Sequence, residues 1–318
     1  MAKKISISII NSVGANSKGL IGIHQLNRQN MVYWNEKIDQ ALYHEPDLIV
    51  LPEVSDKFQD HSIKDYVGYI TSGGGIFPLL SEIAKNNNVN IVYPCVRVVE
   101  EGSDFPYRNS SVFIDRNGNV SYVYDKNYVM VEEKRLGVAY SDVAQTYIHE
   151  NIYMAFGLCF DLNFDDLLKK YKEQEPELFI FSSMYHGGLK QDFWAYNLRT
   201  YMVSAIKGNT SRILDPFGRA IAHTSNYSDF AHGEINVDCA IVHLDHNWTK
   251  IKEAQRKYKK GLEVYDPGNF GTVLMTAESD DFSIDDVLNE FEIIDYDSYL
   301  SQSSLHRQMF LENRGKDL

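Results

Sequence analysis

Short apolar segments alternate with amphipathic segments along the chain, and this alternation is the feature that most constrains the fold. In residues 5–10, Ile5, Ile7 and Ile9 recur at every second position, as in a β-strand. The run LIVL at 48–51 is apolar throughout, which is typical of a strand in a sheet covered on both faces. Strands that alternate with helices predict one α/β domain followed by a C-terminal extension.

The remaining segments continue this pattern. The segment 192–206 is expected to be one helix, because Trp194, Leu198, Tyr201 and Ala205 have the spacing of a buried helix face. Further helices are expected in the thirties, after Pro78, at 164–171, at 248–260 and after Ser283, where Asp286 completes a capping-box pattern. Further strands are expected at 91–96, 110–115, 120–124, 152–160, 178–183, 211–215, 220–224 and 238–245, the last being the final clear strand.

The overall charge and the cysteines exclude several classes of protein. The 31 basic and 44 acidic side chains give a net charge of −13, which repels nucleic-acid phosphates. No apolar run approaches the ~18 residues of a membrane helix, and the start of the chain does not read as a signal peptide. Cys95, Cys159 and Cys239 show no CxxC spacing, and the histidines show no HExxH spacing. We therefore expect a cytoplasmic protein with no metal, no cofactor, no nucleic-acid partner and no membrane contact.

Three side chains of different chemistry each follow an apolar strand segment. Glu53 ends LIVLPE, Lys126 follows VSYVYD, and Cys159 ends IYMAFGLC. Strand ends are where α/β folds assemble their sites. Together the three supply a base, a cation for a developing oxyanion and a nucleophile, which is what cleavage of an amide needs. Taken alone, each also fits a plainer interpretation, since most cysteines are small buried hydrophobes and most Glu and Lys side chains are solvated charges.

These segments resemble the catalytic blocks of the nitrilase superfamily, the carbon–nitrogen hydrolases. LIVLPE resembles its glutamate block, YDKNYVMVEE its lysine block and GLCFDLNF its cysteine block, in the family's order. RNSSVFIDRNGNV, SRILDPFGRAIA and DCAIVHLD resemble weaker elements, so the likeness spans roughly residues 5–245. It implies a four-layer α-β-β-α sandwich, with a carbon–nitrogen hydrolase domain over 1–277 and an acidic, helical extension over 278–318.

The resemblance also implies roles for individual residues. Glu53 is expected to be the general base, Lys126 the oxyanion stabiliser and Cys159 the nucleophile. A second glutamate is expected near the site, and the family's spacing points to Glu133, with Glu132 as the alternative. Asp161 is expected to cap the following helix or to tie down the cysteine loop rather than to act in catalysis. Phe160, Tyr185 and His186 are the expected substrate-binding residues; Tyr185 and His186 closely follow the strand segment at 178–183, and a loop histidine in a glycine turn is the alternative for His186.

The chain departs from the family's usual pattern at several positions. Tyr128 stands where many members carry histidine, and Asp165-Asp166 stands where many carry Pro-Glu. The helix before the late hairpin has Arg199 but lacks the usual Glu-Asn pair. The catalytic set is intact, but the chain lies outside the best-known subfamilies.

The leading hypothesis is a hydrolase that cleaves a non-peptide C–N bond of a small amide or carbamoyl compound through a thioester on Cys159. A nitrilase acting through a thioimidate is a variant of the same chemistry. An N-acyltransferase of the same superfamily and a non-catalytic binding protein are the alternatives. The resemblance further implies a homodimer or larger homo-oligomer.

Overall fold

The computed structural model describes residues 2–314, which form two compact units. The larger unit spans residues 5–235, and the smaller one contains residues 2–4 and 236–314. The division at 235/236 lies upstream of the expected boundary at 277/278. The expected boundary at 277/278 marks the end of the hydrolase domain. The division into compact units does not test it, so it stays a prediction.

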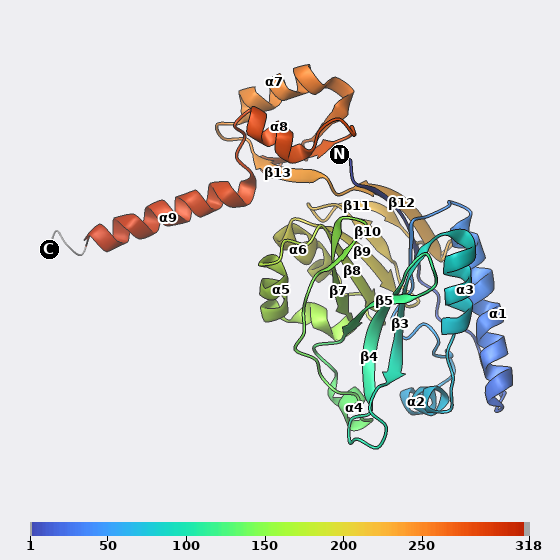
Figure 1. The fold of residues 1–318 in the computed structure, drawn as a ribbon. Helices are drawn as coiled ribbons and strands as arrows, with labels where there is room; N and C mark the ends of the chain where they lie inside the picture. Colours follow the sequence, from blue (N-terminus) through green and yellow to red (C-terminus); the bar gives the residue numbers. More distant parts are fainter. Residues whose placement is uncertain (1, 315–318) are drawn as a thin grey trace. The chain divides into compact units, whose positions relative to one another are not determined.

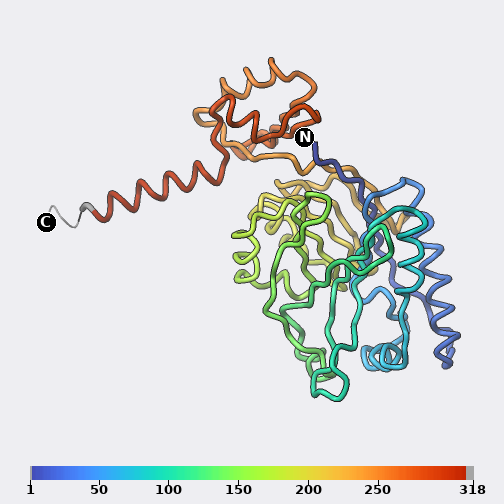
Figure 2. The backbone as a smooth tube through the Cα atoms, in the orientation of Figure 1, coloured from blue at the N-terminus to red at the C-terminus, as the bar shows by residue number. Residues whose placement is uncertain are grey.

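Two six-stranded sheets form the centre of the larger unit (Figures 1 and 2). The first sheet has the order β12 (Phe230–Asn236), β1 (Lys4–Ile10), β2 (Leu48–Val50), β3 (Asn90–Val98), β4 (Tyr107–Ile114) and β5 (Val120–Asp125). The second sheet has the order β11 (Ala220–His223), β10 (Arg212–Leu214), β9 (Tyr201–Ile206), β8 (Leu178–Ser183), β7 (Ile152–Leu158) and β6 (Tyr147–His149). The helices of this unit are α1 (Ile23–Leu42), α2 (Ile63–Thr71), α3 (Phe77–Asn87), α4 (Val131–Arg135), α5 (Asp165–Lys172) and α6 (Leu189–Leu198).

The middle of each sheet is parallel. β1, β2 and β3 run in one direction, and β7, β8 and β9 do the same in the second sheet. Parallel neighbours place their carboxyl ends at one edge of the sheet. The residues that follow β2, β7 and β8 are therefore held at the edges where a site can form.

Helices cover the outer face of each sheet, so the larger unit has the expected α-β-β-α arrangement (Figure 1). On the first sheet, α1 contributes buried Trp34 and Ile38 to a core that also contains Leu80 of α3. On the second sheet, Trp194 of α6 packs against Phe179 of β8, with ring centroids 5.1 Å apart. Each helix buries one apolar stripe on the sheet below it, which is what an amphipathic helix of this kind requires.

Aromatic side chains join the inner faces of the two sheets. Phe156 of β7 is fully buried. Its ring lies 6.4 Å from that of Phe113 of β4 and 5.2 Å from that of Tyr122 of β5. The Ser182 hydroxyl of β8 also donates to the carbonyl of Leu51, just after β2, at 2.8 Å. The two sheets thus pack through both apolar and polar contacts.

The predicted single helix over 192–206 is wrong. Helix α6 ends at Leu198, Arg199 takes a left-handed conformation with φ of 57°, and residues 201–206 form β9. All six residues of β9 are buried, and it pairs in parallel with β8. The apolar residues of this segment fit the period of a helix and also that of a strand, so their spacing alone could not distinguish the two.

The smaller unit contains a three-stranded sheet with the order β13 (Cys239–His243), β15 (Thr272–Ala277) and β14 (Leu262–Tyr265). Its helices are α7 (Trp248–Tyr258), α8 (Ile284–Glu290) and α9 (Tyr296–Arg314). The predicted capping box is confirmed, because Ser283 and Asp286 cap α8 through reciprocal hydrogen bonds. Strands β14 and β15 lie beyond the last clear strand that the sequence indicated. None of the helices in residues 2–314 is long and apolar enough to cross a lipid bilayer.

The contact between the sheets gives a stability prediction. Phe156→Ala should lower the free energy of unfolding by about 3–5 kcal/mol, because it removes a large buried ring and leaves a cavity. Urea unfolding monitored by circular dichroism measures this change. Tyr227→Ala is the control, since Tyr227 is 94% exposed. Equal effects of the two substitutions on the free energy of unfolding would contradict the packing of Phe156 between the two sheets.

Candidate active site

Glu53 lies three residues after the end of β2 and is buried. Its Oε1 accepts hydrogen bonds from Asn109 Nδ2 at 2.9 Å and from Lys126 Nζ at 3.0 Å. Its Oε2 accepts from the backbone N–H of Met184 at 3.0 Å, and Met184 directly follows β8 of the other sheet. The carboxylate is therefore fixed by donors from both sheets.

Lys126 directly follows β5 and is the central cation of the site. Its Nζ lies 3.0 Å from Glu53 Oε1 and 2.9 Å from Glu133 Oε2. Burial by itself lowers the pKa of Lys126, but the two carboxylates outweigh it and raise that pKa above its ordinary value. The side chain is thus held as an ammonium ion in the interior.

Glu133 reaches the site from the short helix α4. Besides Lys126, its carboxylate accepts from Asn109 Nδ2 at 2.9 Å and from the backbone N–H of Met130 at 2.9 Å. Asn109 therefore bridges Glu53 and Glu133. Glu132, the alternative, also lines the cavity but is exposed, and Glu133 is the one that contacts Lys126.

Cys159 is the first residue after β7 and begins the 3₁₀ helix η1 (Cys159–Asn163). Its φ of 46° is left-handed, a conformation that costs a non-glycine residue energy and recurs at functional sites. Burial and the neighbouring Glu53 raise the pKa of the Cys159 thiol to about 12, against the opposing effects of Lys126 and Ser183. The sulfur is therefore a neutral thiol at neutral pH, next to a carboxylate that can accept its proton.

Asp161 fixes the loop that carries Cys159. Its carboxylate accepts from the backbone N–H of Leu158 at 3.0 Å, from the backbone N–H of Tyr128 at 2.7 Å and from the Tyr124 hydroxyl at 2.8 Å. Burial raises its pKa to about 6, while these hydrogen bonds and Lys126 act in the opposite direction. Asp161 thereby ties the cysteine loop to the segment that follows Lys126, consistent with the structural role expected for it.

A cavity of about 200 Å³ connects these groups. It is lined by Glu53, Val54, Ile63, Asn109, Lys126, Met130, Glu132, Glu133, Cys159 and Met184. The structure thus brings together Glu53, Lys126, Glu133 and Cys159. Glu53 and Cys159 are 106 positions apart along the chain.

The expected substrate-binding residues lie outside this cavity lining. Phe160 is partly exposed and packs edge-on against Phe164, with centroids 5.2 Å apart. The Tyr185 hydroxyl donates to Asn163, and His186 Nδ1 accepts from the backbone N–H of Gly188. Their part in substrate binding stays a prediction. No group of three or more His, Cys, Asp or Glu side chains within residues 2–314 is arranged to hold a metal ion.

Sequence reasoning missed Asn109 and Met184. Asn109 could have been singled out, because it is a polar residue next to the apolar run of β4 in a segment that the family resemblance already covered. Met184 contributes to the site through its backbone N–H, and its side chain carries no sequence signal for that role.

The α-β-β-α arrangement of the larger unit (Figure 1) is that of the nitrilase fold. The model of the carbon-nitrogen hydrolase family matches residues 19–239, which is more than half of the chain. The chain belongs to this family.

Known proteins agree with this assignment. The chain is 22% identical over 256 residues to a deaminated glutathione amidase of Dictyostelium discoideum, covering 69% of this chain and 88% of the relative. It superimposes with a TM-score of 0.60 on Nit3 of Saccharomyces cerevisiae, a member of branch 10 of the nitrilase superfamily, at 16% identity and over 73% and 90% of the two chains. A mutant amidase from Nesterenkonia sp. AN1, which carries the acetamide moiety of fluoroacetamide on its active-site cysteine, gives a TM-score of 0.60 at 10% identity, over 80% and 96% of the chains. At these identities the structural likeness concerns the fold.

The buried ion cluster gives a second prediction. Lys126→Met should destabilise the protein by about 3–5 kcal/mol at pH 7, because it leaves two carboxylates without their cation. Urea unfolding at pH 7 measures the effect. Adding Glu133→Gln to Lys126→Met should recover part of the loss, and a double variant no more stable than the single one would contradict the cluster.

Proposed function

We propose that this chain is an amidase-type hydrolase that cleaves a non-peptide C–N bond of a small amide or carbamoyl compound through a thioester on Cys159. The observation that carries the proposal is the placement of Cys159, Glu53 and Lys126 around one small cavity, with Glu53 in contact with both other groups. The family and the names of the amidase relatives support the same class of substrate.

In the first half of this reaction, Cys159 Sγ attacks the amide carbon while its proton passes to Glu53. The negative charge that develops on the carbonyl oxygen is stabilised by the Lys126 ammonium. The C–N bond then breaks, the nitrogen takes the proton from Glu53, and the amine leaves. The acyl group remains on Sγ as a thioester.

In the second half, a water molecule gives a proton to Glu53 and attacks the thioester. The C–S bond breaks, the carboxylic acid leaves, and Sγ regains a proton. The enzyme returns to its starting state, with Glu53 acting as base and then acid in each half. Glu133 keeps Lys126 in place through the 2.9 Å ion pair.

A homo-oligomeric state and a cytoplasmic location belong to the proposal as well. The first follows from the family resemblance and the second from the sequence. A nitrile substrate would react by the same attack on carbon, with a thioimidate in place of the thioester.

The nucleophile gives the first test. Cys159→Ala should lower amine or ammonia release from a panel of small amides by at least about 10³-fold. In the wild-type protein, intact-protein mass spectrometry should detect an acyl adduct that is absent in Cys159→Ala. Cys239→Ala is the matched control and should keep its activity. Retained turnover in Cys159→Ala would refute covalent catalysis by this residue.

The raised pKa of Cys159 gives a second test. Since the resting sulfur is a thiol, its alkylation by iodoacetamide at pH 7.5 should depend on proton transfer to Glu53. Glu53→Gln should therefore slow the alkylation of Cys159 by about tenfold or more, as followed by peptide mass spectrometry. A rate that stays the same or rises would indicate a preformed thiolate instead, because Glu53 is one of the groups that raise the pKa of this thiol.

A further inference from the structure

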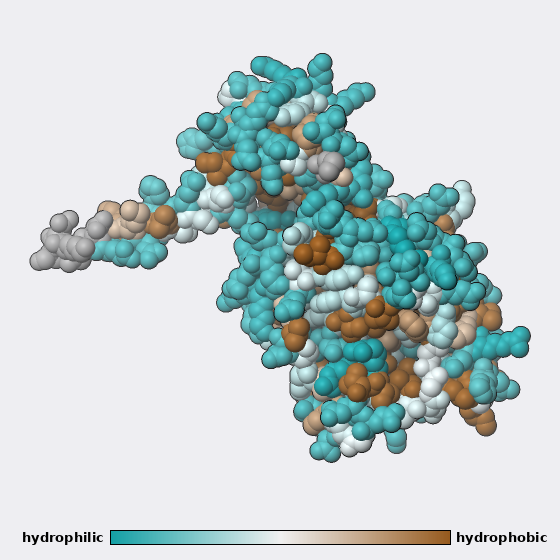
Figure 3. Space-filling view, viewed as in Figure 1, coloured by the Kyte–Doolittle hydropathy of each residue, from teal (hydrophilic) through white to brown (hydrophobic). Residues whose placement is uncertain are grey.

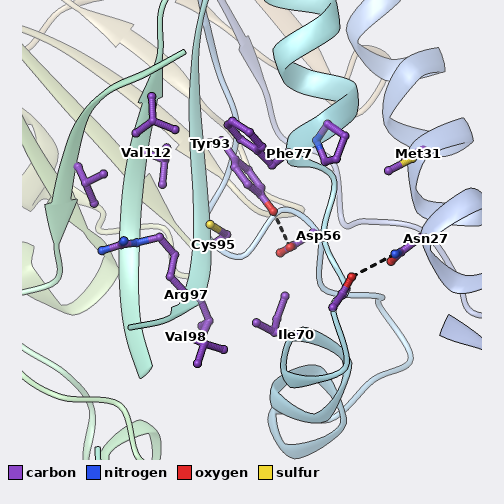
Figure 4. Close-up of a pocket in the computed structure, with 17 residues that line it drawn as sticks. Asn27, Met31, Asp56, Ile70, Phe77, Tyr93, Cys95, Arg97, Val98 and Val112 are labelled. Atoms are coloured by element: carbon purple, nitrogen blue, oxygen red, sulfur yellow. Dashed lines mark hydrogen bonds between the residues drawn. The ribbon is translucent and has the colours of Figure 1, made fainter. Parts of the chain in front are cut away.

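A second and larger cavity lies in the same unit, and none of its lining residues belongs to the proposed active site. It has a volume of about 440 Å³, within the range of small-molecule sites. It is bounded by β3, β4 and β5 of the first sheet and by residues of α1, α2 and α3 (Figure 4). In the space-filling view, hydrophobic residues gather in the region of these strands (Figure 3).

Most of the cavity wall is apolar. Met31, Phe77, Val98, Val112 and Val123 are among the residues that line it. Arg97 also lines it, but its guanidinium is paired with Asp125 at 2.8 Å and donates to Ser110 at 2.9 Å. The charge of Arg97 is therefore already balanced, and most of the wall can contact an apolar ligand body.

One ionisable group of this cavity is deeply buried and lacks an opposite charge in direct contact. Asp56 is fully buried and accepts hydrogen bonds from the Tyr66 hydroxyl at 2.5 Å and the Tyr93 hydroxyl at 2.6 Å. In the part of the chain that the structure describes, no Lys, Arg or His nitrogen lies within 4.0 Å of its carboxylate. Burial raises the pKa of Asp56, against the opposing effects of the two phenols and the more distant Lys207. A buried carboxylate gains most from a cation that completes its coordination.

Gly75 lies next to Asp56 in the lining of this cavity. A Cβ atom placed on Gly75 would lie 3.7 Å from Asp56 Oδ2 and 3.6 Å from the Tyr93 hydroxyl, so any larger side chain there would fill the space above the carboxylate. Figure 4 shows Asp56 and Tyr93 facing each other among the labelled side chains of the lining. Asp56 is thus the one carboxyl group among the described residues that line this cavity, and most of the wall is apolar.

We propose that this cavity binds a small primary amine with an apolar body, whose ammonium group lies on the Asp56 carboxylate and whose hydrocarbon part lies along the valines and Phe77. An ammonium supplies the missing positive charge and donates to the lone pairs that the two phenols leave free. A carboxylate ligand would be repelled by Asp56, and an alcohol would supply a hydrogen bond without the charge.

The site also touches the segment that carries the proposed base. Asp56 lies three residues after Glu53, in a run from Glu53 to Phe58 that is buried throughout. Backbone carbonyls of this run accept from Trp34 Nε1, Asn30 Nδ2 and Lys207 Nζ. An amine on Asp56 would therefore contact the same loop that positions Glu53.

The test measures binding to the Cys159→Ala protein, so its outcome does not depend on whether the chain hydrolyses amides. Isothermal titration calorimetry at pH 7.5 would compare n-hexylamine, n-hexanol and hexanoate, three probes with the same hydrocarbon chain. We expect n-hexylamine to bind at least about tenfold more tightly than n-hexanol, since hydrogen bonds to charged groups exceed neutral ones by this margin. Hexanoate should bind most weakly.

Substitutions then locate the binding. Asp56→Asn should weaken n-hexylamine binding about tenfold or more and leave n-hexanol unchanged. Met31→Trp should weaken both ligands because it fills the cavity from α1. Val32→Trp is the matched control, since Val32 is the next residue of α1, is half exposed and does not line the cavity. Glu133→Gln should have no effect, which separates this cavity from the proposed active site.

Two results would overturn the proposal. One is equal affinity for n-hexylamine and n-hexanol, which would indicate an apolar cavity that does not select a cation. The other is amine binding that survives Met31→Trp, which would place the amine elsewhere. These two results test the proposal even if the Asp56→Asn protein does not fold. Thermal unfolding of each variant shows whether it is folded.

Discussion

The Lys126 ammonium holds the site together. It lies between two carboxylates, 3.0 Å from Glu53 and 2.9 Å from Glu133, and all three groups are largely removed from solvent. Each charge would be unfavourable in this interior without the others. Asn109 donates to both carboxylates and leaves one face of the cluster free for the cavity and for Cys159. The positions of the reactive groups thus follow from mutual neutralisation as much as from the strands that carry them.

The resting chemistry of the cysteine follows from the same arrangement. A thiol in a buried, partly anionic environment keeps its proton, and the pKa of about 12 reflects burial and Glu53 together. The proposed reaction therefore depends on proton transfer during attack. In a cysteine protease, by contrast, a neighbouring histidine keeps the cysteine as a thiolate before the substrate is attacked. Here the backbone conformation at Cys159 and the hydrogen bonds of Asp161 fix where the sulfur points.

Much of this arrangement could be predicted from the sequence. Glu53, Lys126 and Cys159 stood out because each follows an apolar strand segment, and the family resemblance added Glu133. The α-β-β-α fold also followed from that resemblance. The contributions of Met184 and of the φ angle at Cys159 are properties of the backbone, which side-chain types do not encode. The apolar positions of residues 192–206 fit the period of a helix as well as that of a strand, so the sequence predicts one helix there. Only the pairing of β9 with β8 distinguishes the two. Strands β14 and β15 lie in a region that the resemblance covered poorly.

The Glu53 carboxylate receives one hydrogen bond from a residue that follows β8, while its other donors come from the first sheet. The separation of the two sheets therefore affects the geometry of Glu53, the proposed base. A substitution that changes the distance between the two sheets, for example at an aromatic residue packed between them, would lengthen or shorten the hydrogen bond from Met184 to Glu53. The proposed activity should therefore respond to substitutions between the two sheets, at positions that do not contact the substrate.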